Sequence, residues 1–317
     1  MSLRLVDKYR PKVWADIKGQ DKIVASLKGI VERKSSYPNL LFVGPPGCGK
    51  TALAEVFANE AKFEVKEFNA SDDRTLTFVR DTIKKIAQFS GQRVIVLDEA
   101  DMMINPAQMA LKRIMETSSA IFILCANDEW RIEDAIKSRC SIYRFPRLSD
   151  DTIKQKLVDV INHEGYKISN DPSVGEGLLK LAENSLGDMR TALNSLEAVV
   201  DSTRSITADS ISLVLVATGL PILAMAKALE GDFQTAKELI EKAYVEGNYN
   251  PSTSFKQLYE AIPKLNINTE MKIRMFEKLG EVERGVKMGG DPVIQIVTYI
   301  AFLWLLPHAS GCPILNR

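Results

Sequence analysis

The residues Gly-Pro-Pro-Gly-Cys-Gly-Lys-Thr at 44–51 constrain the fold of this chain more than any other feature. They have the spacing of a phosphate-binding loop, between an apolar run at 40–43 and a helix-forming stretch at 52–61. Such a loop directs backbone N–H groups and a helix N-terminus at phosphate oxygens. We therefore predict that Lys50 reaches the β- and γ-phosphates of ATP and that the Thr51 hydroxyl holds Mg²⁺, whereas a chance glycine turn is the less favoured alternative. The other predicted loop contacts are Gly44, Pro45, Pro46, Gly47, Cys48 and Gly49.

Short apolar runs alternate with amphipathic stretches through the first half of the chain. β-branched and aromatic residues make up the runs, which end in Gly, Asn or Asp, and the stretches between them have helical spacing. This alternation predicts an α/β fold with a parallel sheet and right-handed crossovers. The expected strands are 40–43, 65–68, 94–97, 121–124 and 143–145, and the expected helices include 52–61, 76–89 and 106–116.

Beyond residue 149 the strand pattern disappears and helical spacing takes over. The sequence predicts a nucleotide-binding domain at 1–148, a wholly helical lid domain at 149–218 and a second all-α domain at 219–317. N-caps are expected at Ser149 and Asp188, and the stretch at 219–221 should break the helical pattern. The expected helices are 150–163, 172–184, 189–200, 208–216, 222–230, 233–246, 251–262, 268–286 and 292–306.

Two acidic residues follow the buried strand predicted at 94–97. Asp98 and Glu99 stand at its C-terminal end, where open α/β sheets bind their ligands. We expect Asp98 to hold Mg²⁺ and Glu99 to polarise an attacking water as a general base. Acids that merely cap the next helix are the alternative, which the nearby phosphate loop makes less favoured.

Three further polar residues gain meaning from these two motifs. Asn127 follows a predicted strand and should lie beside Asp98, where an amide can orient water or touch the γ-phosphate. Arg139 is either a surface arginine or reaches a nucleotide in a neighbouring subunit, since an arginine supplied in trans commonly meets the charge on a transferring phosphoryl group. Arg190 is either an ordinary first-turn residue or a sensor of bound phosphate.

Composition limits the remaining classes of protein. The longest apolar run, at 293–306, falls short of the roughly 18 residues of a membrane-spanning helix, so no membrane partner is expected. The N-terminus has no apolar signal region and the four cysteines show no CxxC spacing, which predicts a cytoplasmic location, or a nuclear one in a eukaryote. The 41 basic residues balance 41 acidic ones, which argues against a free-standing DNA binder.

Taken in order, the motifs resemble those of AAA+ ATPases of the clamp-loader clade, and specifically the small subunits of replication factor C. The resemblance runs the whole length of the chain. Its most specific pieces are DKYRPK at 7–12, IKGQ at 17–20, NASDDR at 69–74, DEAD at 98–101, ALKRIME at 110–116, SRC at 138–140 and GDMR at 187–190.

The resemblance implies roles that spacing alone does not give. It implies that Val6 and Arg10 flank the adenine, that Asn127 is sensor 1 and that Arg190 is sensor 2 in the lid. It also implies that Arg139 is an arginine finger acting on the ATP of the adjacent subunit. The last hundred residues resemble the collar that holds five such subunits in a ring.

The implied function is that of an ATPase motor subunit of a clamp loader, with ATP and Mg²⁺ as cofactors. The implied partners are a large subunit and further small subunits in a heteropentamer, the sliding clamp PCNA and primer–template DNA. Two alternatives remain. One is a ring subunit that binds nucleotide structurally and mainly donates Arg139, and the other is a different AAA+ DNA-processing ATPase, such as a Holliday-junction motor.

One helix is predicted to contact DNA. Arg80 and Lys84 share a face of the helix expected at 76–89, and the resemblance places that helix along a DNA strand. A solvated charged face is the alternative.

Two departures from the family pattern concern Cys48, which replaces the usual Thr, and an unusual Trp130 after sensor 1. We expect ATP binding to survive at Cys48 with a thiol open to oxidation, and Trp130 to be exposed at a subunit contact.

Overall fold

The computed structural model describes residues 4–33, 37–72, 74–88, 93–169, 171–203, 205–245 and 251–306. Contacts divide the chain into two compact units. The first comprises Met1–Glu164 with Gly187–Glu197, and the second comprises Gly165–Leu186 with Ala198–Arg317. The domain boundaries expected after residues 148 and 218 stay predictions.

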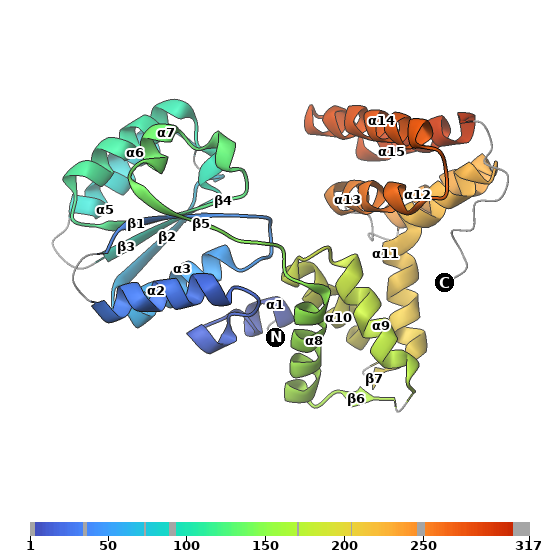
Figure 1. Ribbon diagram of the computed structural model, residues 1–317, viewed down its shortest axis with the longest axis horizontal. Coiled ribbons are helices and arrows are strands. Elements are labelled where there is room, and N and C mark those ends of the chain that lie inside the picture. The colour runs from blue at the N-terminus through green and yellow to red at the C-terminus, as the bar shows by residue number, and fades with distance from the viewer. Residues whose placement is uncertain are drawn as a thin grey trace. The chain divides into compact units, whose positions relative to one another are not determined.

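The first unit is built on a five-stranded parallel sheet with the strand order β2-β3-β4-β1-β5 (Figure 1). All five predicted strands are present, and the predicted α/β class is confirmed. The strands are β1 (Asn39–Val43), β2 (Glu64–Asn69), β3 (Arg93–Asp98), β4 (Ile121–Ala126) and β5 (Cys140–Arg144). The helices are α1 (Leu5–Lys8), α2 (Asp21–Arg33), α3 (Lys50–Glu60), α4 (Leu76–Phe78), α5 (Lys84–Gln88), α6 (Asn105–Thr117), α7 (Asp134–Lys137) and α8 (Asp150–Glu164), with single turns at η1 (Trp14–Asp16), η3 (Ala100–Met102) and η4 (Glu129–Arg131).

Helices cover both faces of this sheet, with α2 and α3 on one face and α5, α6 and α7 on the other (Figure 1). The central strands therefore carry continuous apolar runs at 40–43, 94–97 and 121–126, because alternate side chains enter different cores. On β1, Leu40 and Phe42 pack with α2 and α3, whereas Leu41 and Val43 pack with the opposite helices. Because all five strands run parallel, their carboxyl ends lie at one edge of the sheet, where Asp98, Glu99 and Asn127 are found.

Two features of the first unit differ from the sequence expectation. Helix α2 was not anticipated, although Ile23, Val24, Leu27 and Ile30 recur at helical spacing and are buried. The helix expected at 76–89 contains a π-helical segment, η2 (Val79–Ile83), between α4 and α5, and residue 89 lies outside the described part. The predicted N-cap at Ser149 is present, since its hydroxyl accepts from the amide of Thr152 at 3.2 Å.

The second unit is mainly helical. Its helices are α9 (Ser173–Asn184), α11 (Ala208–Leu229), α12 (Phe233–Val245), α13 (Pro251–Ala261), the turn η5 (Ile262–Lys264), α14 (Thr269–Lys287) and α15 (Pro292–Leu305), while α10 (Met189–Thr203) begins in the first unit. The expectation of a region without strands is wrong in detail, because β6 (Lys167–Ile168) pairs in parallel with β7 (Ser205–Ile206). Strands of two residues are too short to produce an alternating pattern in the sequence.

Helix α11 runs through the position where the sequence predicts a break. Pro221 lies inside it, and the helix is bent rather than ended, since proline cannot donate to the carbonyl four residues earlier. Within the described residues no single helix is long and apolar enough to span a membrane. The two arms of α11, at 208–215 and 219–229, meet the length and composition criteria only when taken together.

Candidate active site

The phosphate loop connects β1 to α3, as the sequence predicts. Gly49 caps α3 at a φ of 97°, a left-handed conformation that glycine adopts readily. Gly47 has a φ of +71°, and a Cβ added there would lie 1.8 Å from Oδ1 of Asp188. The Gly47 carbonyl also accepts from the amide of Met189 at 3.2 Å. The loop therefore closes tightly against the start of α10, which leaves no room for a side chain at Gly47.

The side chain of Lys50 lies within the loop among oxygen acceptors, and the residue is only 7% exposed. Its Nζ donates to the carbonyls of Gly44 at 2.7 Å and Pro45 at 2.8 Å, and to Oδ1 of Asn127 at 2.9 Å. The structure thus brings together Lys50 and Asn127, which are 77 residues apart in the sequence. An ammonium held in this way offers a fixed positive charge to a phosphate that enters the loop.

Thr51 and Asp98 meet directly. The Thr51 hydroxyl donates to Oδ2 of Asp98 at 2.7 Å, at the C-terminal end of β3. Hydroxyl and carboxylate oxygens are ligands that Mg²⁺ prefers, and this ion usually completes its shell with water and substrate phosphates. The pair therefore fits the predicted Mg²⁺ site beside the phosphate loop.

Glu99 adopts an unusual backbone conformation. Its φ of 52° and ψ of 38° lie in the left-handed region, which costs a residue with a side chain about 1 kcal/mol. The amide of Glu99 donates to Oδ1 of Asp98 at 2.9 Å, which helps to fix this turn. Local strain of this kind is concentrated at functional sites, because the surrounding structure must enforce it.

Asp101 is a site residue to which sequence reasoning assigned no role. It is 4% exposed, and its carboxylate accepts from the amides of Asn127 at 3.2 Å and Asp128 at 3.3 Å. These bonds fix the loop after β4, and with it the Asn127 side chain. The signal was present in the DEAD motif, but only the fold shows that its last acid faces the neighbouring strand.

A cavity of about 390 Å³ connects these groups. The predicted residues that line it are Val6, Arg10, Pro46, Gly47, Cys48, Gly49, Lys50, Thr51, Asp98, Glu99, Asn127 and Arg190. Gly44, Pro45 and Arg139 do not line it. A second cavity of about 410 Å³, beside Trp130 and Arg131, contains none of the predicted nucleotide-site residues. The roles assigned to individual residues stay predictions, but their convergence on one cavity gives the phosphate loop a matching space for a nucleotide.

Arg139 lies directly before β5 and does not line this cavity. Its Nε donates to Oε1 of Glu116 at 2.7 Å, and its Nη2 contacts the same oxygen. Its Nη1 donates to the carbonyl of Ala135 at 2.6 Å and to Oγ of Ser138 at 3.1 Å. The side chain is 31% exposed, so this guanidinium is held by its neighbours and still accessible.

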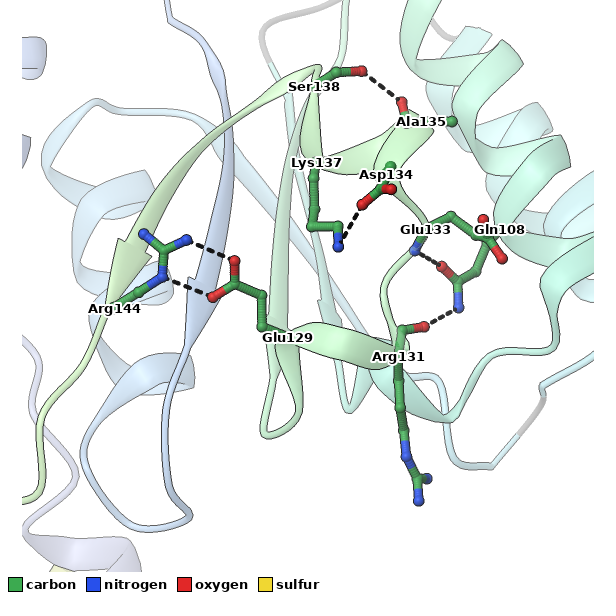
Figure 2. A network of polar contacts seen from close by, with 9 residues as sticks. All are labelled: Gln108, Glu129, Arg131, Glu133, Asp134, Ala135, Lys137, Ser138 and Arg144. Carbon is green, nitrogen blue, oxygen red and sulfur yellow. Dashed lines mark hydrogen bonds and ion pairs between the residues drawn. The ribbon is translucent and has the colours of Figure 1, made fainter.

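Polar contacts hold the segment that leads from β4 to Arg139 (Figure 2). The Gln108 side chain donates to the Arg131 carbonyl at 3.0 Å and accepts from the Glu133 amide at 2.9 Å. Glu129 pairs with Arg144 on β5 at 2.6 Å. Trp130 is 74% exposed, so its predicted exposure is confirmed, while its place at a subunit contact stays a prediction.

The two residues predicted to contact DNA are both exposed. Arg80 lies in η2 and Lys84 begins α5. Val79 and Ile83, each one position earlier, are fully buried. Arg80 and Lys84 therefore leave the helical segment on the same side despite the π-helical turn.

Cys48 differs from the expectation of an oxidation-prone thiol. It is 2% exposed, and burial raises the pKa of its thiol even though the Lys50 charge opposes the shift. Oxidation requires an accessible thiolate, and this environment disfavours both accessibility and ionisation. The position therefore contributes packing and backbone to the loop.

A pair of carboxyl groups contacts Arg10. The guanidinium of Arg10 binds Glu55 of α3 and lies 3.5 Å from Oε1 of Glu67 on β2. Burial, together with a hydrogen bond to Glu67, raises the pKa of Glu55 from 4.5 to about 7, although Arg10 opposes this shift. Glu55 is therefore partly protonated near neutral pH, where it can donate to Glu67.

This raised pKa makes the stability of the chain depend on pH. The folded state binds the Glu55 proton more tightly, so its contribution is complete below pH 4.5 and is lost as pH rises through about 7. In Glu55→Gln, the fall in unfolding free energy between pH 5 and pH 8 should be about 1–2 kcal/mol smaller than in the parent chain. Urea titrations at both pH values measure this, with the exposed Glu60→Gln on the same helix as the control. An identical pH dependence in the parent and in Glu55→Gln would contradict the assignment.

The fold and the site define an AAA+ ATPase. Residues 40–148 match the family model described as ATPase family associated with various cellular activities, and residues 221–301 match the Replication factor C C-terminal domain. The chain is 37% identical to a replication factor C small subunit from Archaeoglobus fulgidus, over 94% of this chain and 96% of that protein. It is 34% identical to human replication factor C subunit 4, over 93% of this chain and 86% of that protein. The chain belongs to the replication factor C small-subunit family, and it is an ATPase.

Solved structures show the same fold at lower sequence identity. The RuvB Holliday-junction branch-migration motor of Thermotoga maritima aligns with a TM-score of 0.59 at 16% identity, over 70% of this chain and 80% of that chain. At this identity the likeness concerns the fold alone. The predicted family is therefore supported by the relatives that share its sequence, rather than by the fold it shares with other motors.

Proposed function

We propose that this chain is an ATPase motor subunit that uses ATP binding and hydrolysis to open the sliding clamp PCNA and load it onto primer–template DNA. The partners in this proposal are a large subunit and further small subunits in a heteropentamer. Its relatives carry the name of replication factor C subunits, which supports a multi-subunit setting. Within one chain, the cavity supplies contacts for phosphates, the Thr51 and Asp98 side chains for Mg²⁺, and a candidate base, Glu99.

The placement of Arg139 is the observation that carries the proposal. All the other predicted catalytic groups line the nucleotide cavity, whereas Arg139 is held by Glu116 outside it. Phosphoryl transfer is catalysed mainly by positioning and by compensation of charge. In this proposal the site keeps Arg190 from its own chain and gains the charge of a further arginine, the neighbour's counterpart of Arg139, on assembly, so ATP turnover becomes dependent on the neighbouring subunit.

The residues of this site have separate tasks in the proposed mechanism. Lys50 and Arg190 would contact phosphate oxygens, Asn127 would orient the attacking water, and Glu99 would accept its proton. Thr51 and Asp98 would hold Mg²⁺, which would supply charge compensation on the phosphates.

Clamp loading by the reconstituted complex tests this function. Loading of the clamp onto primed DNA should require ATP, and Lys50→Ala in this subunit should reduce it by at least tenfold, because a charged contact to phosphate is lost. The exposed Lys28→Ala on α2 is the matched control. A complex that assembles with the clamp, hydrolyses ATP and loads none onto DNA would contradict the proposal and favour another AAA+ DNA-processing role.

The charged side of η2 and α5 gives a separate prediction about DNA. Arg80→Ala/Lys84→Ala should weaken binding of primed DNA to the complex. The slope of log K against the logarithm of the salt concentration should become shallower by about 1–2, because up to two phosphate contacts per subunit are lost. DNA-independent ATP hydrolysis should be unchanged. Lys22→Ala/Lys28→Ala, on a helix covering the opposite face of the sheet (Figure 1), is the control. An unchanged salt slope would show that this side only contacts solvent.

A further inference from the structure

The N-terminal strap, which we define as residues 4–11, borders the nucleotide cavity. Its residues on the cavity wall are Arg4, Val6, Asp7, Tyr9, Arg10 and Pro11. Lys50 of the phosphate loop and Asp98 at the end of β3 supply the polar part of the same wall. Apolar lining comes from Val6, Leu148 and Leu193. When the phosphates of a nucleotide occupy the loop, its base therefore lies in the apolar part of the cavity, next to the strap.

Tyr9 anchors the strap to the last turn of α8. Its hydroxyl donates to Oε1 of Glu164 at 2.5 Å and lies 2.8 Å from Nδ1 of His163. Its ring packs edge-to-face on His163, with centroids 5.6 Å apart. Lys8 pairs with the same Glu164 at 2.6 Å, and Lys8 with Tyr9 lowers the pKa of that carboxyl, so a full negative charge accepts both bonds.

The strap is also tied at both of its ends. The amide of Leu5 donates to Oε1 of Glu197 on α10 at 3.1 Å, and Arg10 binds Glu55 and Glu67 as described above. Tyr9 lies between Val6 and Arg10, the two residues implied to flank the base. A bond to an ionised acceptor is about twice as strong as a neutral one, so the Tyr9 anchor is a substantial restraint on this stretch.

We propose that Tyr9 is a positioning residue for the nucleotide base. Its hydroxyl, held by Glu164 and His163, keeps Val6 and Arg10 against the base end of the cavity before ATP arrives. A strap ordered in advance loses less conformational entropy on binding, which strengthens binding without a contact to the reacting phosphates. The inference rests on the proposed placement of ATP in this cavity.

Two ligands separate this role from a general effect on folding. Inorganic tripolyphosphate has the phosphates of ATP without the base, so it reports on the phosphate loop alone. In the full chain, Tyr9→Phe should raise the Kd for ATP by about three- to tenfold, since hydrogen bonds to a charged group are lost, and leave the Kd for tripolyphosphate unchanged. In the assembled complex, the same variant should raise KM for ATP with kcat unchanged.

Matched variants control for the loss of a hydroxyl. Tyr143→Phe removes a hydroxyl that lies 3.0 Å from Oγ of Ser26, outside the cavity, and should leave both ligands unaffected. Glu164→Gln keeps the shape of the acceptor but removes its charge, so it should weaken ATP binding less than Tyr9→Phe and add little to it in the double variant.

Three outcomes would overturn the inference. Equal weakening of ATP and tripolyphosphate by Tyr9→Phe would indicate a general structural role, and unchanged ATP binding would show that the anchor does not act on the nucleotide. Additive effects of Tyr9→Phe and Glu164→Gln would show that the two residues act separately. If Lys50→Ala leaves tripolyphosphate binding intact, the proposed placement of the phosphates fails independently of the role of Tyr9.

Discussion

Replacing Glu99 with glutamine should lower ATP hydrolysis at this subunit's site in the assembled complex at least about 100-fold while ATP still binds. Glu99 lines the cavity immediately after Asp98, and its left-handed backbone is fixed by the bond from its own amide to Oδ1 of Asp98. Glutamine preserves the shape of the side chain but cannot accept a proton from water. The phosphate loop is untouched, so the loss should appear in kcat and leave the affinity for ATP near its original value.

An exposed glutamate outside the cavity provides the control for Glu99→Gln. Glu32→Gln on the exposed end of α2 removes the same charge far from the cavity and should leave turnover unchanged. Single-turnover hydrolysis and nucleotide binding, measured on the same complexes, separate chemistry from affinity. Full activity in a Glu99→Gln complex would mean that this subunit binds nucleotide structurally and is not itself a motor.

Most of the fold that carries Glu99 could be predicted because its signals are local. The strand residues of β1, β3 and β4 form continuous apolar runs, since helices cover both faces of the sheet. The phosphate loop needs only the spacing of glycines and a lysine between a strand and a helix. The carboxyl ends of parallel strands share one edge, so Asp98 and Asn127 could be placed together before any coordinates were known.

What could not be predicted depends on contacts between distant residues. The bond between Tyr9 and Glu164 spans 155 residues, and neither residue belongs to a pattern that identifies the other. The raised pKa of Glu55 likewise arises from burial and from Glu67 on a different element. Helix α11 shows an error of the opposite kind, in which a local signal was given too much weight. The rule that proline ends a helix predicted a break at Pro221, whereas the helix continues with a bend and packs into the core of the second unit.

Substituting Arg139 by alanine should lower ATP hydrolysis at the adjoining subunit's site by about 1,000-fold. Arg139 does not line the cavity of its own chain, and its guanidinium is held in an ordered position by Glu116, Ala135 and Ser138. An arginine supplied across an interface compensates charge that develops only in the transition state. The isolated variant should therefore bind ATP as well as the parent chain, while the complex loses turnover.

ATP binding by the isolated chain and ATP turnover by the complex together show which subunit's site Arg139 serves. Arg144→Ala removes a similarly paired arginine five positions further along and should have little effect, because an exposed ion pair contributes about 0–1 kcal/mol. Arg139→Lys should remain strongly impaired, since an ammonium cannot reproduce the planar two-point contact of guanidinium with phosphate oxygens. Weakened ATP binding in the isolated Arg139→Ala chain would instead place this residue in its own site. Loss in the complex alone requires that the last catalytic charge comes from the neighbour, which makes assembly itself the step that permits hydrolysis.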